Sequence, residues 1–177
     1  MFFHFIFGMV SFLFCLISFL IAMLLDCQNN SLGSNIFIAF FTASFLSFVS
    51  STISYLIMRK NNITSYLGAL QAYRSKFRRF YKDISIKSNS DILSQDLQDL
   101  KNHFYDLNYN VYNNIQFFFV NKELPLKLDL AHKKILHVQG GLNCEHLDNL
   151  DTYSNDIDYA IDIIQTILKR LKNYIYK

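Results

Sequence analysis

The stretch that decides the fold is residues 32–60, LGSNIFIAFFTASFLSFVSSTISYLIMRK. It is apolar over 32–58, apart from Asn35 and small and hydroxyl side chains, and it stops at Arg59 and Lys60. At 1.5 Å per residue, a helix of this length exceeds the roughly 30 Å hydrocarbon core of a bilayer. The stretch therefore predicts a membrane-spanning helix over residues 32–58.

An earlier apolar run covers residues 2–25 and is also long enough to span a bilayer. Residues 1–58 contain a single acid, Asp26, and no Lys or Arg. Because the polar connector 26–31 is too short to fold by itself, we predict an antiparallel transmembrane hairpin over residues 1–58 with an outer loop at 26–31. A cleaved signal peptide is the alternative for the first run, but neither a basic start nor a small-residue cleavage site accompanies it.

The charges predict how this hairpin is oriented. Residues 59–82 hold seven Lys and Arg and no acid, whereas the connector 26–31 holds no cation. The positive-inside rule therefore predicts that residues 59–177 and both termini lie in the cytoplasm. Membrane lipid is the first expected partner.

The first span carries a stripe of small side chains. They recur at steps of three and four residues, which places them on one helical face: Gly8, Ser11, Cys15, Ser18 and Ala22. In lipid, small residues let another helix approach closely. We therefore expect this face to pack against a helix.

Hydroxyl side chains crowd the second half of the second span, where Ser44, Ser47, Ser51 and Ser54 share one face. One interpretation is that their hydroxyls bond to the carbonyl one turn earlier and help helices to pack. The other is that several copies of the helix surround an aqueous path and these four residues line the pore, because polar faces in membranes usually line a bundle interior or a water-filled cavity. The second interpretation requires a homo-oligomer, which we expect to be a tetramer.

The apolar positions of residues 59–177 repeat with a helical period almost throughout. They predict a stem that prolongs the second span over 59–84, and helices over about 91–120, 125–139 and 144–176. Gly140 and Gly141 are expected to end the third of these four helices. The expected fold class is thus an all-α membrane protein, with a two-helix transmembrane hairpin and a cytoplasmic four-helix bundle. The apolar seams serve either as the core of one bundle or as contacts between copies.

The stem is basic and rich in aromatic residues. Guanidinium groups beside aromatic rings suit a phosphate with a stacked base, as in proteins that hold nucleotides or single-stranded nucleic acid. The alternatives are ion pairs with the more acidic segment 83–165 and contact with anionic lipid. The residues expected to bind a nucleotide or oligonucleotide are Tyr73, Arg74, Arg78, Arg79, Tyr81 and Lys82.

Catalytic and metal-binding motifs are missing from the sequence. His132, His137, Cys144 and His146 match no standard metal-ligand spacing, so ordinary core or surface histidines are the favoured interpretation. The sequence also lacks a phosphate-loop motif and a nucleophile elbow. We therefore expect no metal, no cofactor and no enzymatic activity.

The layout of the chain resembles that of the small two-transmembrane effectors of bacterial anti-phage defence, of the Hailong, retron and cyclic-oligonucleotide types. The shared features are two spans over residues 2–58 with a very short connector, and a stem over residues 59–82 that leads into a helical tail. The resemblance implies a homo-oligomeric pore in the bacterial inner membrane whose opening kills or arrests the infected cell. It also implies a gating ligand, a nucleotide or single-stranded oligonucleotide made by a partner nucleotidyltransferase. In the Hailong-like case, a single-stranded DNA oligomer would hold the channel shut.

These observations lead to two functional hypotheses. The first is an oligomeric ion channel or pore of anti-phage defence, gated by a nucleotide or single-stranded nucleic acid at its cytoplasmic helices. The second is a membrane-tethered coiled-coil scaffold, which recruits a cytoplasmic protein partner through its bundle and conducts no ions.

Overall fold

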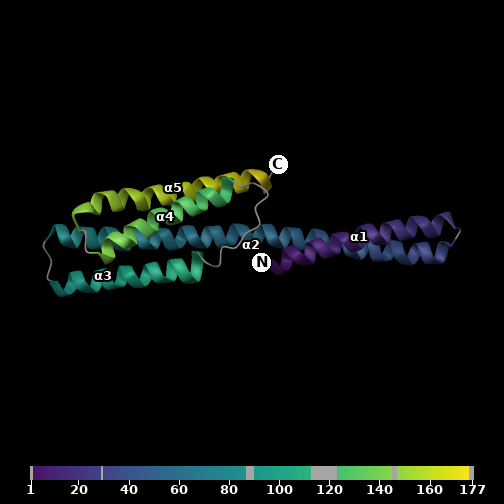
Figure 1. The fold of residues 1–177 in the computed structure, drawn as a ribbon, viewed down its shortest axis with the longest axis horizontal. Coiled ribbons are helices and arrows are strands. Elements are labelled where there is room, and N and C mark those ends of the chain that lie inside the picture. Colours follow the sequence, from purple (N-terminus) through teal and green to yellow (C-terminus); the bar gives the residue numbers. More distant parts are fainter. Residues whose placement is uncertain (1, 29, 87–89, 113–122, 145–146, 176–177) are drawn as a thin grey trace. The chain divides into compact units, whose positions relative to one another are not determined.

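The computed structural model describes residues 2–28, 30–86, 90–112, 123–144 and 147–175. Every regular element in this part of the chain is a helix, which confirms the predicted all-α fold (Figure 1). The elements are α1 (Phe2–Cys27), α2 (Ser31–Ser85), α3 (Ser90–Tyr105), the π-helical η1 (Asp106–Tyr112), α4 (Glu123–Asn143), the 3-10 turn η2 (Leu147–Asn149) and α5 (Leu150–Ile175). The chain forms two compact units, Met1–Arg59 and Lys60–Lys177, and α2 contributes to both.

In the first unit, α1 packs against the first part of α2. Among the α1 side chains that are described, the buried ones are the five small residues of the predicted stripe, which confirms that this is a packing face. Aromatic rings add to the contact, since the ring centroids of Phe12 and Phe48 are 5.3 Å apart. Asn30 caps the start of α2, where its Oδ1 accepts a hydrogen bond from the Gly33 amide at 3.0 Å.

Both helices of this unit are long and apolar enough to cross a membrane. In the most apolar 18-residue window, 28% of α1 and 6% of α2 is buried. Large side chains such as Leu13, Phe14 and Leu20 are more than half exposed. Neither α1 nor the apolar segment of α2 therefore has the burial expected of the core helix of a soluble domain.

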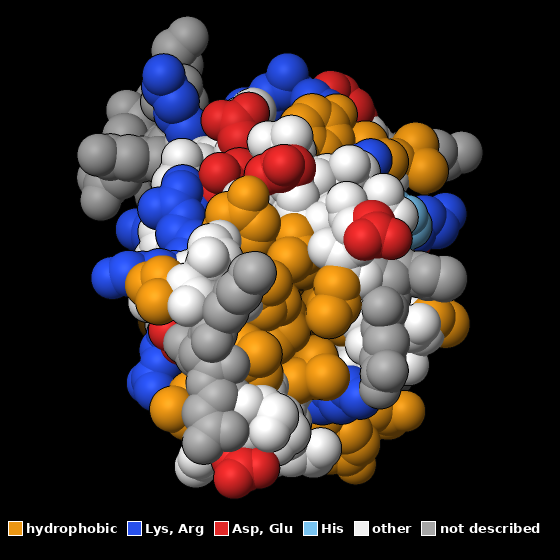
Figure 2. All heavy atoms as spheres, turned by 90° about the vertical axis from the view of Figure 1, so that its left-hand side faces the viewer, with side chains coloured by type: hydrophobic (Ala, Val, Ile, Leu, Met, Phe, Trp, Pro, Cys, Tyr) orange, Lys and Arg blue, Asp and Glu red, His pale blue; other side chains and the backbone are white. Residues whose placement is uncertain are grey.

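The second unit is built around one face of α2. The buried residues on this face recur at steps of three and four, and each is at most 2% exposed: Ile63, Tyr66, Leu70, Tyr73, Phe77 and Phe80. They share a single hydrophobic core with residues of α3, η1, α4 and α5. In this unit α3 and α5 run antiparallel to α2 (Figure 1). Figure 2 shows the end of the unit where α2 leads to α3 and α4 leads to α5, and apolar side chains reach the surface there between charged ones.

Several predicted helices differ from the observed ones in extent, including the one predicted over 125–139, which is observed as α4 (Glu123–Asn143). The helix predicted over 91–120 corresponds to α3, which continues directly into the π-helical η1, and residues 113–120 lie outside the described residues. The helix predicted over 144–176 corresponds to α5, which begins only at Leu150 after the short turn η2.

The glycine pair in α4 has a different role from the predicted one. The helix runs through Gly140 and Gly141 and ends at Asn143. A Cβ atom at Gly141 would overlap the ring of Tyr153 on α5, whereas a Cβ atom at Gly140 would have no neighbour within 4 Å among the described atoms. Gly141 therefore permits a close approach of α4 and α5 instead of ending the helix.

Two buried polar pairs connect α2 to α4. The hydroxyl of Tyr66 lies 3.3 Å from Nδ1 of His132, and the hydroxyl of Tyr73 donates to Oε1 of Gln139 at 3.4 Å. Both pairs join residues 66 positions apart, so the two helices run parallel. The Tyr112 ring stacks on His132 with centroids 3.4 Å apart. Burial lowers the pKa of His132 to about 4 and raises the pKa of both α2 tyrosines.

Candidate anion-binding site and pore-lining face

The four serines predicted to line a pore lie on the side of α2 that packs against α1. Ser51 is buried, and its Oγ would lie 3.5 Å from a Cβ atom placed on Gly8 of α1. Ser44, Ser47 and Ser54 share this face and are half-buried. Within one hairpin, this arrangement corresponds to the packing interpretation of the serine face.

The edge of this face is more accessible. Ser50 is exposed, and on a helix of 3.6 residues per turn it lies on the same flank as the half-buried Ser47 and Ser54. Thr42 and Thr52 are also exposed, but their hydroxyls donate to the carbonyls one turn earlier at 2.9 Å. The flank formed by Ser47, Ser50 and Ser54, which we call the serine edge, is therefore the polar surface that α1 leaves accessible.

The structure separates the two tyrosines predicted to stack on a ligand base. Tyr73 is fully buried and bonded to Gln139, so its ring is not accessible to a ligand. The period of the buried α2 face could have revealed this placement. Tyr81 is half-buried, and its hydroxyl donates to Oδ1 of Asp151 at 2.9 Å. This hydrogen bond raises the pKa of Tyr81.

The cations at the distal end of the stem face acids of α3 and of α2 itself. Nε of Arg79 lies 3.8 Å from Asp83 and 3.6 Å from Asp96, and Nζ of Lys76 lies 3.7 Å from Asp99. Lys82 is exposed in the last turn of α2, where a cation also suits the negative end of the helix. For Arg79 and Lys76, the structure favours the ion-pairing interpretation.

The neighbours of Asp96, which pairs with Arg79, affect its protonation. Burial raises the pKa of Asp96, and a hydrogen bond with Asp83 adds to this effect. The Arg79 guanidinium opposes both effects. The region is therefore a network of opposite charges at the surface of the second unit, where the Arg79 side chain is 72% exposed.

Arg74 and Arg78 form a different arrangement, which is the strongest candidate for a binding site. Both pair with Asp158 of α5. Together with Gln71 and Ser75 they line an open depression of about 350 Å³. These four α2 residues are spaced i, i+3, i+4 and i+7, which places them on one helical face. Two guanidinium groups, an amide and a hydroxyl form a donor set suited to phosphate.

Sequence reasoning found the two arginines of this depression and missed its other members. The spacing of Gln71 and Ser75 around Arg74 was a usable signal, because all of them fall on one face. Asp158 gave no such signal, since it comes from another helix far along the chain.

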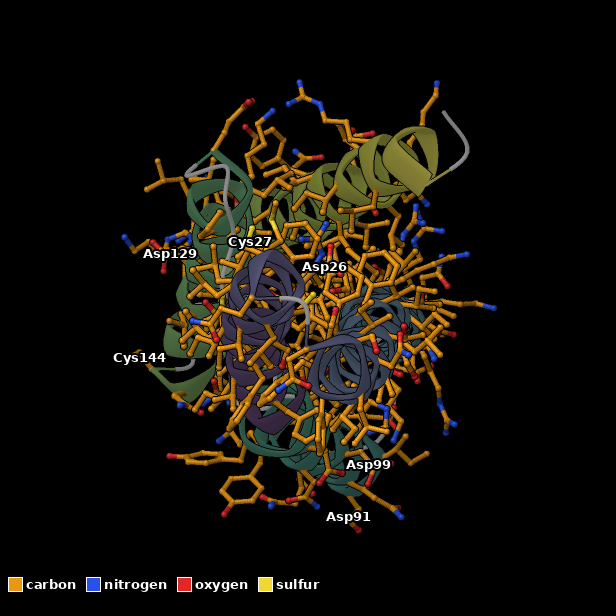
Figure 3. All side chains as sticks on the ribbon, turned by 90° about the vertical axis from the view of Figure 1, so that its right-hand side faces the viewer. Asp26, Cys27, Asp91, Asp99, Asp129 and Cys144 are labelled. Atoms are coloured by element: carbon orange, nitrogen blue, oxygen red, sulfur yellow. The ribbon has the colours of Figure 1, made fainter. Side chains whose placement is uncertain are left out.

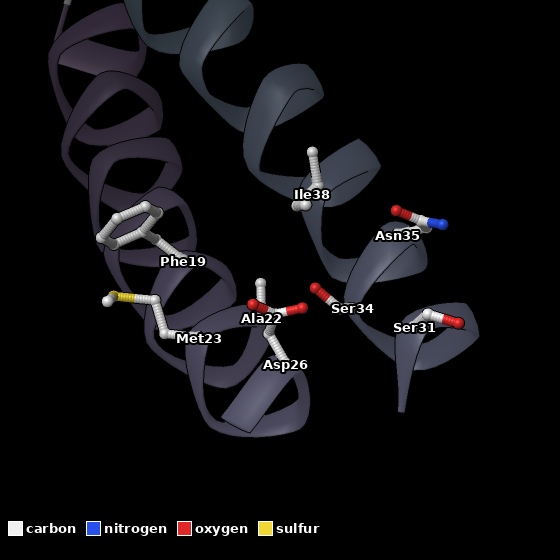
Figure 4. A pocket seen from close by; sticks show the side chains of 8 residues that line it. All are labelled: Phe19, Ala22, Met23, Asp26, Ser31, Ser34, Asn35 and Ile38. Atoms are coloured by element: carbon white, nitrogen blue, oxygen red, sulfur yellow. The ribbon is translucent and has the colours of Figure 1, made fainter. Parts of the chain in front are cut away.

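A second depression, of about 230 Å³, lies at the turn of the hairpin (Figure 4). Asp26, the acid of the hairpin, and Ser34 point toward one another there from α1 and α2, and Ser31 and Asn35 complete its polar lining. A carboxylate at this position also suits the positive N-terminal end of α2. This favourable interaction is a sufficient structural reason for Asp26.

The histidines and cysteines do not form a metal centre among the described residues. His132 is buried beside Tyr66, and Nδ1 of His137 lies 2.8 Å from Asp156. Cys144 is exposed just beyond α4 (Figure 3). The fourth residue considered above, His146, lies outside the described residues.

No protein-family model, no curated protein and no solved structure matches this chain. The resemblance to defence effectors therefore rests on the layout of the chain alone.

Proposed function

We propose that this is a membrane protein. In this proposal α1 and the first part of α2 form the transmembrane hairpin, and the rest of α2 forms a cytoplasmic four-helix bundle with α3, α4 and α5. The support is the exposure of large apolar side chains along both helices, which water would penalise by about 25 cal/mol per Å² and lipid would not. The cluster of cations after Met58 gives the direction of insertion.

We further propose that the protein is an oligomeric membrane effector of bacterial defence, a pore whose opening depends on a phosphate-bearing ligand at the stem. The observation that carries this proposal is the continuity of α2. One helix, Ser31–Ser85, contains both the exposed apolar segment and the buried face of the second unit. A ligand that changes how the stem packs would therefore act on the same helix that lines the pore.

The pore lining follows from the accessible surface of the hairpin. Ser51 is used in the contact with α1, so the serine edge is the serine surface of α2 that a neighbouring copy can reach. In an oligomer, this edge would face the centre and the phenylalanine-rich surface of α1 would face lipid.

The pore is tested by S47L/S50L/S54L, which replaces the serine edge by apolar bulk. We expect this variant to insert and assemble normally but to stop depolarising cells and to stop releasing ions from liposomes, because a dry constriction resists ions. The matched control is T42L, which also changes an exposed hydroxyl to leucine, on the side of α2 opposite Ser51. Undiminished conductance in the triple variant would remove the serine edge from the pore.

The membrane-tethered scaffold remains the second candidate function. It is favoured by the outer side of α4, where Leu126 and Leu130 are 67% and 41% exposed one turn apart. If membrane potential and growth stay normal during phage infection of expressing cells, and L126S/L130S loses a co-purifying partner that the parent chain retains, the scaffold is the function.

A further inference from the structure

Asp158 is held between two arginines of α2. Its Oδ1 pairs with Nε of Arg74, and its Oδ2 lies 3.6 Å from a terminal nitrogen of Arg78. The side chains of Arg78 and Asp158 are 58% and 40% exposed, so solvent and solutes reach this ion pair. Both arginines also line the depression with Gln71 and Ser75.

The charges at this place do not balance. Two guanidinium groups face one carboxylate, whereas Arg79 alone has carboxylates of Asp83 and Asp96 within 4 Å. A guanidinium offers five N–H donors, and the ion pairs with Asp158 engage one nitrogen of each arginine. The depression therefore has surplus positive charge and surplus donors.

We infer that Asp158 is a built-in competitor for a phosphate group at Arg74 and Arg78. In the absence of ligand, its carboxylate neutralises part of the site and ties α5 to α2. A phosphate group presents more oxygen atoms to two guanidinium groups than one carboxylate does, and it can bond both arginines together with Gln71 and Ser75. Binding then displaces Asp158.

This exchange of Asp158 for phosphate would be the event that couples ligand binding to pore opening, and in that respect it rests on the function proposed above. The polar contacts between α2 and α5 include the Asp158 pairs and the hydrogen bond of Tyr81 to Asp151. A ligand that takes over the arginines would remove the first of these contacts while leaving the second. Helix α5 would then be held less firmly against the stem.

The ligand chemistry is a phosphate group, which a nucleotide, an oligonucleotide or an anionic phospholipid can supply. The test uses the full chain in nanodiscs of phosphatidylcholine and a fluorescein-labelled oligothymidine at low salt, with binding followed by fluorescence anisotropy. In separate samples, phosphatidylglycerol vesicles or inorganic pyrophosphate compete with the labelled probe. Displacement by pyrophosphate but not by vesicles identifies a soluble ligand, and displacement by vesicles identifies the lipid headgroup as a source.

Three variants separate the roles of the charges. D158N keeps the shape of the side chain and removes the competing charge, so we expect it to lower the Kd of oligothymidine by about fivefold or more. D129N removes one negative charge from an exposed pair with Lys133 on α4 and should leave the Kd nearly unchanged, which controls for net charge (Figure 3). R74Q/R78Q should abolish binding. Circular dichroism checks folding, and D158S replaces D158N if that variant is unfolded.

The outcomes separate this inference from the proposed function. If D158N and D158S bind no more tightly than the parent chain while R74Q/R78Q does not bind, the arginines are a ligand site but Asp158 is not its competitor. If D129N tightens binding as much as D158N, the effect is one of net charge and the inference fails. If neither the parent chain nor D158N binds the labelled oligothymidine, both the inference and the ligand-gated part of the proposed function fall. The pore is then tested separately by the serine-edge variant S47L/S50L/S54L.

Discussion

Acid should destabilise the second unit through His132. The imidazole is buried against Tyr66 and Tyr112, and its pKa falls from 6.5 to about 4 because burial disfavours the charged ring. Asp129 opposes this shift only in part. Between these pH values the unfolded chain binds a proton that the folded protein excludes. The contribution of neutral His132 to the free energy of unfolding is therefore fully present above pH 6.5 and is lost as the pH falls toward 4. At about 1.4 kcal/mol per pKa unit, the loss amounts to about 3 kcal/mol at pH 4.

The measurement is guanidinium unfolding of the full chain in mild detergent, followed by near-UV circular dichroism of the tyrosines across that pH range. The reference is H132Q, which keeps a polar side chain beside Tyr66 but does not titrate. Contributions from the other histidines and from the carboxylates are common to both proteins and cancel in the difference. If the two proteins lose stability in parallel as the pH falls, His132 titrates normally in the folded state and its stacked, buried position is refuted.

Two further predictions concern packing and topology. G141A should destabilise the second unit by about 1 to 3 kcal/mol because its new methyl group overlaps a tyrosine ring, whereas G140A should be neutral or stabilising by up to about 1 kcal/mol, as chemical unfolding of the pair will show. In spheroplasts, a membrane-impermeant maleimide should label Cys27 but reach Cys144 only after lysis, and it should leave the buried Cys15 unlabelled in both cases. The reverse order of labelling for the two exposed cysteines would invert the proposed topology.

The helical fold was predictable because its signals are local. Steps of three and four residues identified the packing face of α1, and the long apolar run identified the first part of α2. The same rule also covers the buried face of the stem, where Tyr73 continues the spacing of Tyr66 and Leu70. A ligand role was predicted for Tyr73 because its ring was considered together with the neighbouring arginines and not with this spacing.

The candidate site was only half predictable. The arginines are visible in sequence because they cluster, but the acid that pairs with two of them comes from α5 and is set by how the helices pack. The role of Gly141 was missed for the same reason, since a glycine that ends a helix and one that admits a neighbouring ring look alike in a sequence. Partners across helices are non-local, and a periodic pattern contains no information about them.

The spacing of the two polar pairs between α2 and α4 has a consequence for folding. Apolar seams with a seven-residue repeat accept neighbours shifted by one repeat, because each side chain meets another of the same kind. Shifting α4 by seven residues would place Tyr66 opposite Pro125, which cannot accept its hydrogen bond through a side chain. A buried hydroxyl without a partner costs about 1 to 3 kcal/mol. Tyr66 thus penalises a shift of α4 in this direction, which the apolar contacts alone would tolerate.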